Sequence, residues 1–371
     1  MKKHVIIATG AALLSTSAFA TKARMTALGQ DSERGSQYIQ DGRNKFRNAA
    51  HVNNMNNYAV MEWGANADAE GGFFRSTGSL AYGLYMGSDH RQAAYEEYDT
   101  ATGWDDVTGY NPGNELDLFI GGDAGVQWGA RLNYMSGEDE TSSEKRSAFG
   151  LGLGMIMGDI NAYANIDISD KLEDSTPNAN TESKAKLGFD LGAAYTMNNM
   201  TFHADYASNK LEATANGTTG LVEGTVSSIE VGAAQTHEIS STAMVFFAGQ
   251  YSNNKVEYTD TLGGSNDNAK RTSNALTATI GFEADATSWL TWRGSVAQNI
   301  IIGSTKTEGS PVGFVPVASN GKKVTDINST TVAAGASLTF GKLVVDGTIG
   351  SNVGSLRLDE AFTNVAVSYW F

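Results

Sequence analysis

The 371-residue chain contains no cysteine and only 4 prolines. Without cysteine it can form no disulfide, no thiolate metal site, no cysteine nucleophile and no lipid-modified N-terminal cysteine. Charged residues make up 18% of the chain, below the roughly 25% of ordinary soluble domains. The net charge is -15, so we expect no nucleic-acid partner, because phosphate contacts need concentrated Lys and Arg.

Long hydrophobic runs are also missing. A membrane-spanning helix needs about 20 nearly unbroken apolar residues, and no stretch after the N-terminus approaches that length. Hydrophobic residues nevertheless make up 41% of the chain, beside 42 glycines. This combination excludes a bundle of membrane-spanning helices, so the apolar side chains must be removed from water in another kind of structure.

The first 20 residues have the features of an export signal. Lys2 and Lys3 form a basic start, and an apolar stretch follows from Val5 to Leu14. The sequence Ala18-Phe19-Ala20 supplies the small residues of a cleavage site at Ala18 and Ala20. We therefore expect residues 1–20 to be a signal peptide and the protein to leave the cytoplasm.

Alternation of apolar and small or polar residues dominates the chain from Tyr58 to Phe371. Between Phe149 and Met155, large apolar side chains occupy every odd position and glycines every even one. This period of two is typical of a strand with two different faces. About fourteen such segments follow one another, and Tyr58 to Ala65 adds a candidate first strand. The pattern predicts an all-β fold over residues 58–371: a transmembrane antiparallel up-and-down β-barrel of about 14 strands (range 12–16).

The connections between these segments alternate in length. Gly158-Asp159, Asn198-Asn199 and Ser240-Ser241 are two-residue turns. Long polar loops lie between them, of which residues 88–113 and 303–328 are the longest. Alternating short turns and long loops are typical of a barrel with a periplasmic and an outer rim.

Polar and charged residues occupy the other face of the predicted strands. Lipid cannot satisfy such groups, so we expect them to face a water-filled lumen. Acidic residues outnumber basic ones there, which predicts a mild preference for cations. The predicted pore-lining residues are Arg75, Asp117, Arg131, Asp167, Lys186, Asp190, Asp205, Glu230, Glu283, Arg293 and Asp346.

Residues 21–57 do not fit the barrel pattern. They begin with a stretch of helical composition, and their cations outnumber their acids, opposite to the rest of the chain. One interpretation is a plug held in the acidic lumen by complementary charge, and the other is a periplasmic extension or disordered leader. Asn48-Ala49-Ala50 resembles the Asn-Pro-Ala of the hatch region in the long-chain fatty-acid transporter family, with Ala49 in place of proline.

The C-terminus carries a further resemblance. Val367, Tyr369 and the terminal Phe371 alternate with smaller residues, and this ending resembles the assembly signal of Gram-negative outer-membrane β-barrel proteins. Residues 58–371 are most similar in pattern to porins and major outer-membrane proteins. The resemblance implies an outer-membrane location, contact with lipid and lipopolysaccharide, and recognition by the barrel assembly machinery. The resemblance is also compatible with assembly into a homotrimer.

The resulting functional hypothesis is a porin-like channel for passive diffusion of small hydrophilic solutes. Two alternatives remain: a plugged transporter of hydrophobic substrates of the fatty-acid-transporter type, for which Phe246 and Val344 on the inner face are hints, and a structural or adhesive barrel that acts through its long loops. His203 and Asp205 share a strand face and could pair as a base and its orienting carboxylate. No nucleophile motif accompanies them, so we expect no enzyme, no cofactor and no metal site.

Overall fold

The computed structural model describes residues 21–64, 67–88, 113–141, 143–174, 181–215, 220–261, 267–300, 303–309, 323–324, 330–352 and 361–371. The predicted signal peptide, residues 1–20, and most of the two longest predicted loops lie outside the described residues. In the part described, no helix has the length and apolar character needed to cross a bilayer.

The described chain is almost entirely antiparallel β-structure in one sheet. Its strands are β1 (Tyr58–Gly64), β2 (Ala67–Thr77), β3 (Leu80–Met86), β4 (Leu116–Asp123), β5 (Gln127–Asp139), β6 (Glu144–Met157), β7 (Ile160–Asp174), β8 (Thr181–Ala185), β9 (Gly188–Met197), β10 (Met200–Ala215), β11 (Val222–Ser240), β12 (Ala243–Asp260), β13 (Asp267–Thr287), β14 (Leu290–Asn299), β15 (Ser304–Gly309), β16 (Lys323–Val324), β17 (Thr330–Phe340), β18 (Leu343–Asn352) and β19 (Ala361–Trp370).

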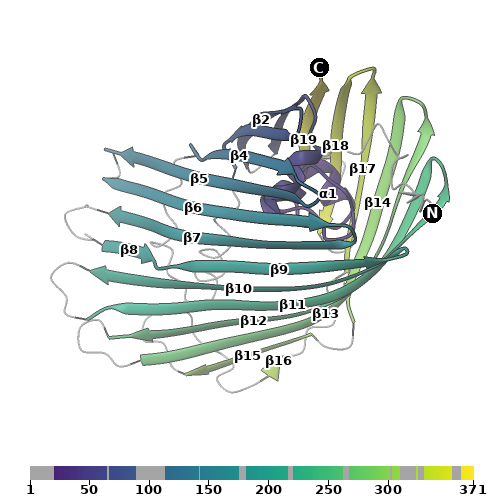
Figure 1. The fold of residues 1–371 in the computed structure, drawn as a ribbon. Helices are drawn as coiled ribbons and strands as arrows, with labels where there is room; N and C mark the ends of the chain where they lie inside the picture. Colours follow the sequence, from purple (N-terminus) through teal and green to yellow (C-terminus); the bar gives the residue numbers. More distant parts are fainter. Residues whose placement is uncertain are drawn as a thin grey trace, which may run out of the picture.

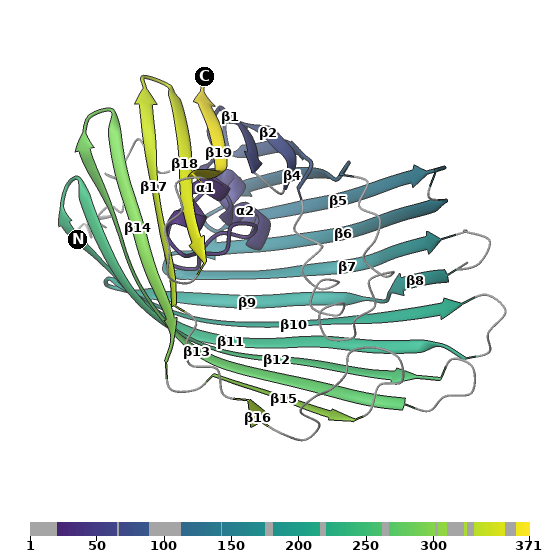
Figure 2. The same ribbon diagram turned by 180° about the vertical axis from the view of Figure 1, so that it is seen from behind.

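The sheet closes on itself because β1 pairs with β2 on one side and with β19 on the other. Three positions in the barrel hold two short strands in succession: β8 with β9, β14 with β15, and β16 with β17. The result is a closed barrel of 16 strands, drawn from opposite sides in Figures 1 and 2. The predicted fold class is confirmed, with a strand number at the upper end of the predicted range.

The outer face of the barrel is apolar. In β4, Leu118 and Ile120 are 45% and 48% exposed, whereas Asp117 and Phe119, which alternate with them, are buried on the inner face. The same alternation leaves large apolar side chains exposed on most other strands, among them Leu132, Leu191, Phe202, Phe247, Ile280 and Val296. A closed barrel with such a surface satisfies every backbone group internally and faces hydrocarbon outside.

One strand of the barrel, β2, was missed from the sequence. Phe73 and Phe74 are adjacent, so the segment shows no clean alternation. In the structure Phe73 is exposed outside, while Phe74 is fully buried inside, in one apolar cluster with Phe46 of the N-terminal segment. Each face of β2 therefore carries a large apolar side chain at this point, and periodicity alone cannot detect such a strand.

The short turns gather at one end of the barrel. Gly158 and Asn198 adopt positive φ angles of 58° and 55°, as expected for two-residue hairpin turns that match the twist of their strands. The turn predicted at Ser240-Ser241 lies one residue later, because Ser240 still pairs with Ala243. Strands β10 to β13 are 16–21 residues long, about twice what a bilayer requires. They therefore extend well beyond the membrane at the other end (Figure 1).

The N-terminal segment lies inside the barrel. It contains α1 (Lys22–Ala27), α2 (Asn44–Arg47) and the 3-10 helix η1 (Ala49–Asn54). Helix α1 packs against β14, β17, β18 and β19, and η1 packs against β3 to β6. Figures 1 and 2 both show these helices within the barrel wall, near the C-terminal strand. We call residues 21–57 the plug.

Candidate functional site

The most buried charge of the plug is Arg43, whose side chain is fully enclosed. Its Nη1 donates to Glu70 at 2.7 Å and to Glu62 at 3.3 Å, both on the barrel wall. The same nitrogen donates to the hydroxyl of Tyr85 on β3 at 3.0 Å. One plug cation is thus bound to three neighbouring strands of the wall.

A second group of charges joins α1 to another part of the wall, from β13 to β18. Arg24 donates through Nε and Nη2 to the two oxygens of Glu283, at 2.7 and 2.9 Å, a bidentate geometry that guanidinium groups favour. Glu283 also lies 2.9 Å from Arg293, which in turn donates to Asp346 at 2.8 Å. The chain of alternating charges runs from the plug through β13 and β14 to β18.

A third contact region joins two further plug cations, Arg34 and Arg47, to β9 and β10. Arg34 forms an ion pair with Asp190. Arg47 lies 3.6 Å from Asp205, and Gln37 donates to the same carboxylate at 2.7 Å. Carboxylates on several strands around the lumen are therefore neutralised by the plug.

Apolar contacts complete the attachment. Phe246 on the inner face of β12 is fully buried in one cluster with Met25, Leu28 and Ile39 of the plug. A larger cluster joins Phe46 and other plug residues to the wall; its wall members are Tyr58, Val60, Phe74, Ala81, Tyr85 and Phe119. The sequence suggested Phe246 as part of a substrate pocket, but in the structure its side chain packs against the plug.

Glycines on the wall let the backbone of η1 approach closely. A Cβ atom at Gly129 would overlap the carbonyl of Ala49, and one at Gly154 would overlap the side chain of Asn48. Asn48 caps η1 by accepting from Ala50 N–H at 2.9 Å, and it donates to the Met155 carbonyl at 3.2 Å. Gly129 on β5 and Gly154 on β6 therefore make room for the plug.

Two basic groups of the plug are held in unfavourable surroundings. Burial, with a smaller contribution from the neighbouring Arg43, lowers the pKa of Lys45 to about 7. Burial also lowers the pKa of His51 to about 4, with a smaller contribution from Arg47. Both groups hold protons less tightly in the seated plug than in water.

The structure places nine of the predicted pore-lining residues on the inner face. Hydrogen bonds or ion pairs join four of them to the plug: Glu283, Asp190, Asp205 and Arg131, which donates to the Phe46 carbonyl at 3.1 Å. The prediction of cation preference assumed that the carboxylates among them face water, and at these positions they face plug residues instead. The nine are Asp117, Arg131, Asp167, Asp190, Asp205, Glu230, Glu283, Arg293 and Asp346.

The inward placement of Arg75 is wrong. Arg75 pairs across the sheet with Tyr82, and both are exposed on the outer face. It lies three residues before the turn at Gly78, close to the rim. A long arginine side chain there can lay its stem along the apolar wall while its guanidinium reaches water.

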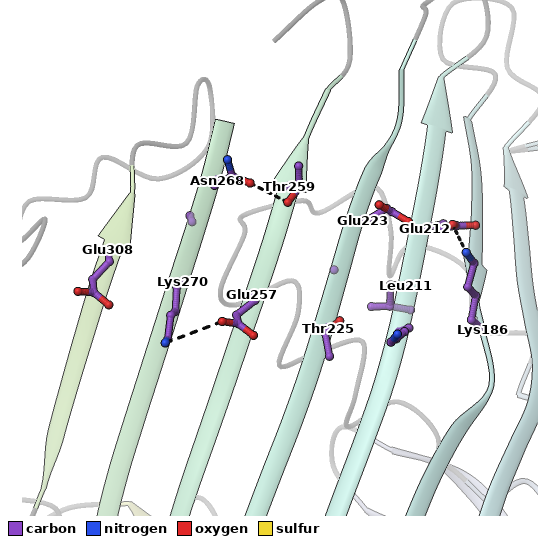
Figure 3. Close-up of a pocket in the computed structure, with 13 residues that line it drawn as sticks. Lys186, Leu211, Glu212, Glu223, Thr225, Glu257, Thr259, Asn268, Lys270 and Glu308 are labelled. Carbon is purple, nitrogen blue, oxygen red and sulfur yellow. Dashed lines mark hydrogen bonds and ion pairs between the residues drawn. The ribbon is translucent and has the colours of Figure 1, made fainter. Parts of the chain in front are cut away.

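The inward placement of Lys186 is also wrong. Three residues separate Ala185 from Phe189, while only two separate their partners Leu211 and Ser208 on β10. The extra residue is a β-bulge, which moves one side chain to the other face. Lys186 therefore points outward and pairs with Glu212 on the outer face (Figure 3).

Around Lys186 the outer face carries alternating charges. A cavity of about 620 Å³ lies there, over the extended ends of β10 to β13 and β15. Glu257 lies 3.8 Å from Lys270 (Figure 3), so opposite charges stand on neighbouring strands. This polar surface marks the level at which the outer face has left the hydrocarbon.

The inner wall at the same level is apolar. Cross-strand pairing brings Val226 opposite Val256 and Ala213 opposite Val222. All four are at most 9% exposed, and they continue into other buried apolar residues of the inner face: Leu172, Leu211 and Ala269. We call these seven residues the apolar wall patch. A lumen that held only water would give no reason for an apolar patch on the inner wall.

Sequence reasoning missed the plug residues that hold the wall, above all Arg24 and Arg43. The available signal was the excess of positive charge in residues 21–57, opposite in sign to the barrel. That signal favoured a plug but could not pair individual cations with individual carboxylates, because pairing depends on register.

A closed 16-strand barrel with an apolar outer surface and polar groups on its inner face is the architecture of outer-membrane proteins. The chain is an outer-membrane β-barrel protein, as the sequence predicts.

Comparison with known proteins gives structural likeness only. No family model matches the chain, and no curated protein matches its sequence. Among solved structures, a Pseudomonas aeruginosa FadL homologue is 11% identical, with a TM-score of 0.43 and coverage of 95% of this chain and 98% of its own. The toluene transporter TbuX of Ralstonia pickettii is 13% identical, with a TM-score of 0.38 and the same coverage. OmpT of Vibrio cholerae is 10% identical, with a TM-score of 0.36, covering 85% and 95%. Likeness at this level carries no argument about what the chain does.

Proposed function

We propose that the protein is a plugged outer-membrane transporter of hydrophobic molecules, in which residues 21–57 must move before substrate passes. The observation that carries the proposal is the buried plug, with Arg24 and Arg43 bound to wall carboxylates at 2.7 Å. A channel for passive diffusion needs a permanently open lumen. Removing one partner from a buried ion pair costs about 3–5 kcal/mol, because the other charge is left uncompensated.

The chemistry of the wall supports hydrophobic substrates. Displacement of the plug uncovers Phe246 on one side and the aromatic cluster around Phe74 on the other. The apolar wall patch lies toward the end with the extended strands. Together these surfaces give an apolar molecule successive places to bind along the lumen.

A matched pair of substitutions on β11 tests this proposal. Val226→Asp places a charge in the apolar wall patch, whereas Thr225→Asp places the same charge one residue away on the outer, water-exposed face. We expect Val226→Asp to reduce binding of a fluorescent fatty acid to the purified protein at least tenfold, and Thr225→Asp to leave it unchanged. Equal binding by both variants would contradict hydrophobic transport.

A second candidate is the diffusion of small hydrophilic solutes. A polar cavity of about 200 Å³ between plug and wall favours it, because glutamine, serine and threonine side chains line much of it. Under this alternative, purified protein would show discrete ion conductance without plug removal and would not bind a fatty acid.

The remaining expectations follow from the proposed transport role. We propose no catalysis. Contact with lipid and lipopolysaccharide, and recognition of Val367, Tyr369 and Phe371 by the assembly machinery, stay predictions. In the barrel, Val367 and Tyr369 point outward from β19, which closes the sheet against β1.

A further inference from the structure

A histidine and two carboxylates meet on the inner face of β10 and β11. His203 Nδ1 lies 3.3 Å from an oxygen of Asp205 and 3.9 Å from an oxygen of Glu230. One donor atom from each residue falls within 4.8 Å of the other two. Asp205 and Glu230 are direct cross-strand partners, so the backbone itself fixes their proximity.

The imidazole is held in one orientation. A Cβ atom at Gly232 would overlap His203 Nε2, so the ring lies directly against the backbone of β11. The ring of Tyr38, from the plug, lies beside it, tilted by 33° with the centroids 6.5 Å apart. His203 is 7% exposed. Its Nδ1 therefore faces the carboxylates without needing to reorient.

The three groups adjoin an open space. The polar cavity of about 200 Å³ is lined by His203 and Glu230 and also by Gln30, Gln250 and Thr277. Within the described residues, no hydrogen bond to the Glu230 carboxylate is found, and this side chain is 32% exposed. The cavity can supply water as a further ligand.

We propose that His203, Asp205 and Glu230 form a binding site for a divalent transition metal such as Zn²⁺. One nitrogen and two carboxylate oxygens are ligands that Zn²⁺ accepts, and tetrahedral coordination at about 2.0–2.1 Å places donor atoms about 3.3 Å apart. The separations of 3.3 and 3.9 Å need only small side-chain rotations to reach that geometry.

The site is coupled to the plug through Asp205. The same carboxylate accepts from Gln37 and lies 3.6 Å from Arg47. A bound divalent cation adds positive charge beside Arg47, so metal binding and plug seating oppose each other. By linkage, seating of the plug weakens metal binding by the same factor by which metal binding weakens seating.

The test is calorimetric titration of untagged, folded protein with Zn²⁺, supported by the visible absorption of Co²⁺ bound in its place. We expect one site, lost in His203→Ala and weakened at least about tenfold in Glu230→Gln. His237→Ala is the control, because His237 is exposed on the outer face of the neighbouring β11. Heat-modifiable migration on a gel verifies that each barrel is folded.

The outcomes separate clearly. Absence of binding by the wild-type protein, or equal binding by His203→Ala, overturns the site. A second arm measures planar-bilayer conductance, where Zn²⁺ should increase channel opening in the wild type and not in His203→Ala. Binding without this increase retains the site and overturns its coupling to the plug.

Discussion

Arg43→Met removes the most enclosed cation of the plug while keeping a side chain of similar length. The carboxylates of Glu62 and Glu70 then remain buried without the guanidinium that lies 3.3 and 2.7 Å away. Loss of one partner from a buried ion pair costs about 3–5 kcal/mol. Lys22, 3.2 Å from Glu70, offsets part of this loss.

Taking the lower bound of about 3 kcal/mol, the equilibrium between seated and released plug shifts roughly 100-fold toward release. The assay uses Ser36→Cys, because Ser36 is 5% exposed in the plug and the chain has no native cysteine. Reaction of this thiol with a maleimide should be about 100-fold faster in the Arg43→Met background, in proportion to the released population.

Two comparisons make the result interpretable. Arg75→Met removes an arginine from the outer face and should leave labelling unchanged. Glu62→Gln added to Arg43→Met removes one of the stranded charges and should restore part of the protection. If Arg43→Met labels no faster than Arg75→Met in a folded barrel, the buried ion pairs do not hold the plug.

Three further perturbations follow from the same contacts. Gly129→Val places a side chain where the Ala49 carbonyl lies, so it should release the plug and raise channel conductance without unfolding the barrel. His51 lies 3.1 Å from Asn161 Nδ2, and burial, with a smaller effect of Arg47, lowers its pKa from 6.5 to about 4. Because the released plug binds this proton more readily, seating should weaken and channel conductance should rise as pH falls from about 6.5 to about 4. The conductance of His51→Gln should lack this rise. In a barrel without its plug, Asp190→Asn should lower the cation-to-anion permeability ratio measured from reversal potentials, because Arg34 no longer neutralises that carboxylate; an unchanged ratio would remove Asp190 from the pore.

The membrane barrel could be predicted from alternation alone wherever lipid lies on one face and polar groups on the other. Alternation does not predict a strand where that contrast is absent, as in β2, whose Phe74 packs on the inner face. Alternation also puts Lys186 on the wrong face, because a single extra residue in one strand moves a side chain to the other face.

The contents of the lumen were less predictable than its wall. The charge of residues 21–57 is compatible with both a plug and a periplasmic extension. Complementary charge attracts two segments over a distance but does not determine where one binds on the other. Val344 and Phe246 were correctly placed on the inner face, but Phe246 serves the plug. Contacts between segments more than 200 residues apart, such as Arg24 with Glu283, cannot be read from local pattern.

Single-channel conductance of the purified protein, with and without residues 21–57, tests the central claim most directly. We predict that the full barrel is closed or opens rarely, and that the deleted form shows large, stable openings with cation preference. Heat-modifiable migration verifies that both forms are folded. Equal, permanent conductance in the two forms would show that the plug does not close the lumen. It would favour the alternative function, a channel for passive diffusion.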